Sequence, residues 1–249
     1  MSVYAVTDLH GRYDLWLQIK AFVQPEDTIY FLGDAVDRGP DSWKLLNELL
    51  TDPQVIFIKG NHEWMLEDAI RDYLRTDGMN VYESTYNLRM NGDVNTFHAW
   101  MYETREDTKI LGVLRNLPLV KEYVNQDGLR IWLSHSGCPP IKNRWSGEYG
   151  IPERLALWDR EHIWKNESWE CPENMICVHG HTPIPFFFAG ENVDIEIEPG
   201  ALWYCNDHKV CIDTGAWASG YTVLLDLDTF DEHIFYDEEL TRLLEQENQ

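Results

Sequence analysis

The chain has 249 residues, 44% of them hydrophobic, so it is long enough to bury one sizeable core. No apolar run approaches the roughly 18 residues that a membrane-spanning helix needs, so we expect no membrane partner. With 43 acidic against 20 basic residues, the net charge is −23. A surface of that charge repels long polyanions, which argues against nucleic acid as a substrate.

The N-terminal residues 1–6 enter a predicted strand directly and lack the basic region and apolar core of a signal peptide. The five cysteines include no Cys-x-x-Cys pair, and an odd number suits reduced thiols better than a disulfide framework. We therefore expect a cytoplasmic location. No linker or internal repeat divides the chain, so a single domain is expected over residues 1–249.

Three units of strand, polar loop and helix open the chain. Apolar runs at 3–6, 28–32 and 55–58 each end in a polar loop, and apolar residues at helical spacing follow each loop. This order implies a parallel sheet, whose ligands bind beyond the carboxyl ends of the strands. The loops carry side chains that bind metal or phosphate: Asp8 and His10, then Asp34, Asp37 and Arg38, then Asn61 and His62.

Asp8 and His10 are two residues apart, and on extended backbone such side chains point the same way, so the pair can hold one ion. The plainer interpretation of this pair alone is an Asp cap beside a surface histidine. Asn61 offers a neutral oxygen ligand, and His62 stands at a helix start as a candidate proton donor. The recurrence of polar loops at three strand ends favours one shared site.

Two stretches interrupt the regular order. Residues 76–118 are rich in glycine, asparagine and aromatic residues, and we interpret them as an insertion near the active site, with one helix spanning 98–116. Residues 139–170 form a second, irregular insertion with four tryptophans, which pack a core more often than they line a recess. Arg160, in this second insertion, would alone be a surface ion-pair residue.

The second half of the chain adds further strands. Runs at 120–124 and 129–133 flank a hairpin turn, which predicts a mixed sheet. The second of these runs ends before His135, and the run 175–178 leads into His179 and His181. A run at 210–212 follows, then two closing antiparallel strands at 221–225 and 233–236 and a C-terminal helix over 238–245.

The oxygen and imidazole donors at these strand ends are numerous enough for two metal ions and suit Mn²⁺, Fe or Zn²⁺ better than Ca²⁺. Two divalent ions roughly 3.5–4 Å apart that share a carboxylate activate a water and bind the oxygens of an in-line displacement at phosphorus. Arg38 and Arg160 carry the planar guanidinium that suits bidentate contacts to a phosphate.

The ordered motifs resemble the phosphoprotein phosphatase family of metal-dependent serine/threonine phosphatases, and most of all its compact bacterial and phage members. The resemblance rests on Asp8-x-His10-Gly11, Gly33-Asp34-x-Val36-Asp37-Arg38-Gly39, Gly60-Asn61-His62-Glu63, His135-x-Gly137 and Gly180-His181-Thr182, with further matches at 157–161 and 213–215. It implies the α/β calcineurin-like metallophosphoesterase fold, a central mixed β-sandwich flanked by helices with the active site at the strand C-terminal ends.

The resemblance also implies a role for each site residue. Asp8 and His10 would hold the first of two divalent ions, with Mn²⁺ the first choice and Fe or Zn²⁺ as alternatives. Asp34 would bridge the ions, and the second would be held by Asn61, His135 and His181. Hydroxide bridging the ions would attack phosphorus in line. The general acid would be His62, oriented by Asp37, and Arg38 and Arg160 would bind the phosphoryl oxygens.

The activity so implied is hydrolysis of phosphomonoesters, with a phosphoserine or phosphothreonine protein or peptide as first-choice substrate, and with dual specificity or a small phosphoester also open. The alternative is a symmetrical diadenosine tetraphosphate hydrolase, against which stands Glu63, where aspartate is expected more often. A non-catalytic scaffold of the same fold is disfavoured because every expected ligand and His62 are present. His179 has no ligand role in the pattern and is assigned to packing or support. The sequence leaves the oligomeric state open.

Overall fold

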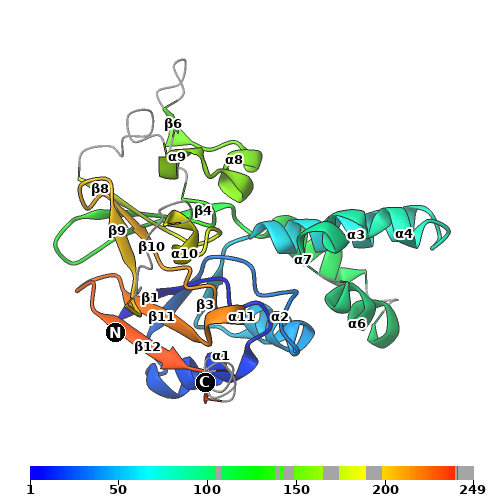
Figure 1. Ribbon diagram of the computed structural model, residues 1–249, viewed down its shortest axis with the longest axis horizontal. Coiled ribbons are helices and arrows are strands. Elements are labelled where there is room, and N and C mark those ends of the chain that lie inside the picture. The colour runs from blue at the N-terminus through cyan, green and yellow to red at the C-terminus, as the bar shows by residue number, and fades with distance from the viewer. Residues whose placement is uncertain are drawn as a thin grey trace.

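The computed structural model describes residues 1–92, 94–104, 108–137, 141–142, 149–164, 174–188, 198–238 and 240. Two five-stranded mixed sheets face each other and helices flank them (Figure 1), as the predicted fold class requires. Within the described residues, none of the helices has the length and apolar character needed to cross a bilayer.

The first sheet is built around the three opening strands. Strands β1 (Val3–Val6), β2 (Thr28–Phe31) and β3 (Val55–Phe57) run parallel, as the order of strand, loop and helix predicts. Two later strands, β11 (Tyr221–Asp226) and β12 (Glu232–Tyr236), extend the sheet beside β1 in antiparallel orientation. The expected closing strands are therefore confirmed.

The second sheet has the order β4-β5-β8-β10-β9. The hairpin of β4 (Val120–Val124) and β5 (Arg130–Ser134) is antiparallel, whereas β5, β8 (Met175–His179) and β10 (Lys209–Cys211) run parallel. The edge strand β9 (Leu202–Tyr204) pairs with β10 and was not predicted from the sequence. A run of three residues is too short for its hydrophobic pattern to distinguish a strand from a loop.

Alternating residues of the first sheet fill two cores. Val3 and Ala5 face the second sheet and contribute to a core with Leu133, Val178 and Ile212. The intervening residues, of which Val6 is one, face the opposite side and pack under the helices α1 (Tyr13–Phe22), α2 (Ser42–Thr51) and α3 (Asn61–Arg75). Because both faces of these strands are buried, the runs are apolar throughout and their polar residues collect at the strand ends.

The segment 76–118 forms a helical arm with α3. Figure 1 shows α3, α4 (Val81–Ser84), α6 (Asn95–Glu103) and α7 (Lys109–Asn116) extending sideways from the sheets; α5 (Tyr86–Asn91) follows α4. The single helix expected over 98–116 was wrong, because α6 ends at Glu103 and α7 begins at Lys109. The two helices bury separate apolar pairs, Phe97 with Trp100 and Ile110 with Leu114.

The remaining elements are short. They are β6 (Ile141–Lys142), β7 (Tyr149–Gly150), α8 (Glu153–Trp158), α9 (Glu161–Trp164), α10 (Ile184–Phe187) and α11 (Ala216–Ser219). Much of the predicted insertion at 139–170, and nearly all of the predicted C-terminal helix over 238–245, lie outside the described residues.

Candidate metal and phosphate site

The loops after β1, β2 and β3 are joined by their backbones. The amides of Asp8 and His10 donate to the carbonyls of Gly33 and Asp34, both at 3.0 Å. Gly33 has a φ of +97°, and a Cβ there would lie 2.5 Å from the Cα of Gly60, so this approach of two loops requires glycine. The three polar loops therefore meet at one end of the sheet.

The backbone at Asp8 and His10 differs from the expectation. Both residues have positive φ, 51° and 43°, so the segment is not extended. The two side chains nevertheless meet, with His10 Nε2 at 3.9 Å from Asp8 Oδ1. Thr7 Oγ1 and the amide of His181 donate to Asp8 Oδ2 at 2.5 and 3.0 Å, which leaves Oδ1 to face the imidazole.

Glu63 ties the second and third loops together. Its buried carboxylate accepts hydrogen bonds from the amides of Asp34, Ala35 and Gly60 at 2.8–2.9 Å. Burial, followed by the nearby charge of Asp34, raises the pKa of Glu63 to about 7. These contacts hold the backbone that presents Asp34, so Glu63 supports the site whatever its substrate.

His62 and Asp37 form a buried pair. His62 Nδ1 donates to Asp37 Oδ2 at 2.7 Å, which fixes the ring and turns Nε2 toward the pocket. Thr96, at the start of α6, donates its hydroxyl to Asp37 Oδ1 at 2.9 Å and accepts the Asp37 amide at 3.1 Å. Arg38 Nη2 lies 3.4 Å from His62 Nε2. The structure thus brings together the predicted acid, its orienting carboxylate and one predicted arginine.

His135 and His181 approach from the second sheet. The rings of both donate to Asn61 Oδ1, at 2.8 and 2.9 Å, and His135 Nδ1 donates to the carbonyl of Leu32. His135 Nε2 lies 3.4 Å from Asp34 Oδ2. His179, by contrast, faces away from this cluster to bond the hydroxyl of Tyr204 at 2.7 Å.

These side chains form two groups that fit metal ions. Ligand atoms of His10, Asp34 and His62 lie within 4.8 Å of one another, as do those of Asp34, His135 and His181. Asp34 belongs to both groups, as a bridging carboxylate must. Of the described residues, His181 has a buried Nε2 without a hydrogen-bond partner, an orphan that a cation would satisfy.

The charges of the cluster are arranged as in a cation site. Burial would raise the pKa of Asp34, but His135, His62 and His10 hold it well below its usual value. Burial would lower the pKa of His135, but Asp34 and Asp8 raise it to about 10. Burial and the nearby positive charges lower the pKa of His10 well below its usual value. A bound cation would replace the proton that His135 carries.

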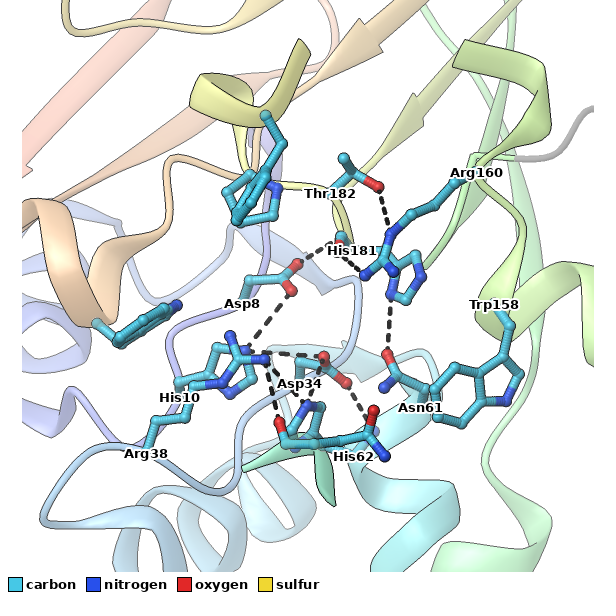
Figure 2. Close-up of a pocket in the computed structure, with 14 residues that line it drawn as sticks. Asp8, His10, Asp34, Arg38, Asn61, His62, Trp158, Arg160, His181 and Thr182 are labelled. Carbon is cyan, nitrogen blue, oxygen red and sulfur yellow. Dashed lines mark hydrogen bonds and ion pairs between the residues drawn. The ribbon is translucent and has the colours of Figure 1, made fainter. Parts of the chain in front are cut away.

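A cavity of about 390 Å³ opens over the cluster. Arg38 and Arg160 lie on opposite sides of it (Figure 2). Arg160 donates to the Thr182 hydroxyl at 3.2 Å. The guanidinium carbon of Arg38 lies 5.0 Å from the ring centre of Trp217, a cation–π contact. Trp158 and Phe186 also line the cavity, so aromatic rings border its polar floor.

Every predicted site residue thus lies in or against one pocket, but several supporting residues were missed. Glu63 was noted in its motif but was given no supporting role, although it stands three residues after Gly60, a spacing typical of a helix-capping pattern. Trp217 lies just after the Asp213-Thr214-Gly215 motif, but Arg38, which it contacts, is 179 positions earlier in the sequence (217 minus 38). Thr96 lies inside the predicted insertion and gave no signal.

A comparison with protein-family models matches residues 1–221 to the calcineurin-like phosphoesterases. The chain is 27% identical to serine/threonine-protein phosphatase 2 of Escherichia coli over 88% of its own length and 89% of that protein's. It is 24% identical to the symmetrical bis(5'-nucleosyl)-tetraphosphatase of Delftia acidovorans, covering 74% of this chain and 58% of that one. Among solved structures, a metallophosphoesterase of Sphaerobacter thermophilus superposes with a TM-score of 0.52 at 15% identity, over 100% of this chain and 95% of that chain.

Proposed function

The chain belongs to the calcineurin-like phosphoesterase family, and from this premise we propose that it hydrolyses phosphomonoesters as a serine/threonine protein phosphatase. The observation that carries the proposal is the pocket itself. Asp34 belongs to two buried groups of ligand atoms, one with His10 and His62 and one with His135 and His181. His62, which bonds Asp37, lines the same cavity as Arg38 and Arg160. Hydrolysis of a phosphoester requires metal ligands, a proton donor and positive groups for the phosphoryl oxygens in one place.

The metal ligands proposed are Asp8, His10 and Asp34 for one ion and Asp34, Asn61, His135 and His181 for the other. When bound, two such ions would activate a water and neutralise charge on the phosphoryl oxygens. His62 also has a ring nitrogen within 4.8 Å of the ligand atoms of His10 and Asp34. We assign it to proton transfer instead, because its Nδ1 is committed to Asp37 and Asp8 Oδ1 already faces His10.

His62 is suited to donate a proton to the leaving oxygen. Burial would lower its pKa, but the carboxylates of Asp34 and Asp37 raise it above the usual value, which favours the protonated ring that a general acid needs. Asp37 fixes which nitrogen faces the pocket. An alkoxide leaves poorly without a proton, and a positioned acid contributes about 10²- to 10⁴-fold.

Arg38 and Arg160 are proposed to bind the phosphoryl oxygens from opposite sides of the cavity. Both side chains are exposed enough to reach a ligand, and each is steadied by a neighbour, Trp217 for Arg38 and Thr182 for Arg160. A phosphoryl group held between two guanidinium groups is oriented as well as bound.

A protein substrate is favoured over a dinucleotide for two reasons. The strongly acidic surface opposes a ligand with several negative charges, and the chain covers 89% of the E. coli phosphatase but 58% of the Delftia hydrolase. The second candidate remains the symmetrical diadenosine tetraphosphate hydrolase. It is favoured by Trp158 and Phe186 at the cavity, which could stack on a nucleobase.

Parallel assays separate the two candidates. Phosphate release from a phosphoserine peptide and cleavage of diadenosine tetraphosphate would be measured with Mn²⁺ and with a chelator. Metal-dependent turnover of the peptide at the higher kcat/KM supports the protein phosphatase. Selective cleavage of the dinucleotide would assign the protein to the second candidate.

A further inference from the structure

The helical arm carries an exposed apolar row. Met79, Tyr82, Tyr86 and Met90 are 54–81% exposed, and we name these four residues the apolar stripe. Tyr82, Tyr86 and Met90 are spaced four residues apart on the two short helices α4 and α5, which meet at Thr85. The Thr85 amide bonds the Val81 carbonyl and the Thr85 carbonyl accepts the Arg89 amide, so successive members of the row lie about one turn apart. Exposed apolar residues in a contiguous row mark an interaction surface more often than single ones do.

The apolar stripe points away from the body of the arm. On the other side of the same helices, Leu88 is fully buried and Ser84 donates to Asp72 of α3 at 2.6 Å. Thr85 is also fully buried. These contacts fix α4 and α5 on α3, so the exposed row cannot turn inward without breaking them. Methionine and tyrosine are enriched in the cores of protein interfaces.

The stripe leads to the catalytic cavity. Asn91, at the end of α5, lines that cavity, and its carbonyl accepts a hydrogen bond from Arg38 Nη2 at 3.4 Å. Asn91 directly follows Met90 of the stripe. Tyr82 lies nine positions before Asn91, about 14 Å at 1.5 Å per helical residue, which an extended peptide spans with about four residues.

The local charge also suits a polypeptide. Within residues 76–92 there are two acidic residues and one basic residue, so the stripe is close to neutral on a molecule whose net charge is −23. A small phosphoester in the cavity is too short to reach Tyr82. A polypeptide that enters the cavity with its phosphorylated residue must leave it along a neighbouring surface.

We propose that the apolar stripe is a docking surface for protein substrates, which binds apolar side chains about two to five residues from the phosphorylated residue. The inference rests on the proposed function, because it assumes that the cavity receives a phosphorylated polypeptide. The stripe would then contribute to kcat/KM only for substrates long enough to reach it.

The test compares the double variant Tyr86→Ser/Met90→Gln with a matched control, Tyr102→Ser/Val124→Gln. The control removes one exposed tyrosine and one exposed apolar residue outside the stripe. Each protein is assayed with Mn²⁺ on p-nitrophenyl phosphate, on a three-residue phosphoserine peptide and on a phosphoserine peptide of 15 residues with apolar flanks. Sedimentation velocity and thermal melting accompany the assays.

The expected result is a loss of about tenfold or more in kcat/KM on the long peptide for the stripe variant alone, with both short substrates unchanged. An equal effect on all three substrates, or none on the long peptide, would overturn the inference while leaving the phosphatase in place. A dimer that becomes monomeric in the stripe variant, with long-peptide turnover retained, would assign the stripe to a second copy of the chain. If the wild type hydrolysed small esters but no phosphopeptide, the proposed function itself would be wrong.

Discussion

At the scale of single residues, the proposed acid His62 and its partner Asp37 depend on a hydroxyl from the helical arm. Thr96 both donates to Asp37 Oδ1 and accepts its amide. The Thr96→Val variant keeps the shape of the side chain and removes both bonds. Since one hydrogen bond contributes about 1 kcal/mol net, kcat should fall about three- to tenfold. Steady-state kinetics on p-nitrophenyl phosphate checks this, with the exposed Thr51→Val as control; an unchanged kcat would contradict it.

Trp217 acts at the same scale through Arg38. A cation–π contact at a partly exposed site is worth about 0.5–1 kcal/mol, so Trp217→Leu should weaken the affinity for inorganic phosphate about two- to fivefold. Trp217→Phe should retain most of the affinity because it keeps a ring. The measurement is calorimetric titration of the Mn²⁺-loaded protein with phosphate. In an Arg38→Ala background the Trp217→Leu change should have no further effect, and an equal loss there would argue against a role through Arg38.

Some site residues could be predicted from local sequence pattern, and others could not because the residues they contact lie far away in the chain. Asp34, Asn61 and His62 were found because each directly follows an apolar strand, and the parallel order brings strand ends together. Thr96 and Trp217 were missed because their partners, Asp37 and Arg38, are distant in the chain. Local pattern carries no information on such contacts.

At the scale of elements, the strand ends achieve their geometry through unusual backbone. The backbone angle φ lies between 43° and 68° at five of these residues, Asp8, His10, Asp34, Asp37 and Arg38. Residues other than glycine rarely adopt such values. The sequence located these loops but predicted extended backbone at Asp8 and His10, because alternation is visible in a sequence and left-handed φ is not. The strands themselves were predictable, apart from the short β9.

Strand β8 places a neutral histidine in the interior. Burial, aided by the positive charges of Lys209 and His135, lowers the pKa of His179 to about 3 despite a bond to the Gly180 carbonyl. The unfolded chain, with an ordinary value near 6.5, therefore binds an extra proton between about pH 3 and 6.5. Stability from this group is present above pH 6.5 and is lost as the pH falls.

The expected loss from His179 is about 2 kcal/mol in the free energy of unfolding between pH 7 and pH 5. Urea unfolding of the wild type and of His179→Gln would show it, since the variant should lack this part of the pH dependence. The exposed His208→Gln is the matched control. Equal pH slopes in wild type and His179→Gln would contradict the assignment.

At the scale of the whole molecule, the proposed metal site joins the two sheets. Asp34 comes from the first sheet and His135 and His181 from the second, so bound ions would hold the sandwich together at one end. A ligand that binds only the folded state at 100 times its Kd adds about 2.7 kcal/mol. Saturating Mn²⁺ should therefore raise Tm by about 5–10 °C. Asp34→Asn should abolish most of the shift, and an unshifted wild type in calorimetry would contradict the metal assignment.

The proposed function depends above all on His62, which would protonate the leaving group in a metal-dependent phosphatase. The most direct test is phosphate release from a phosphoserine peptide by wild type, His62→Asn and the control His208→Asn, with Mn²⁺ occupancy measured on the same samples. We expect kcat to fall by about 10²- to 10⁴-fold in His62→Asn, at unchanged metal content, and to stay unchanged in the control. Retained activity in His62→Asn, or a loss that follows loss of bound metal, would contradict it.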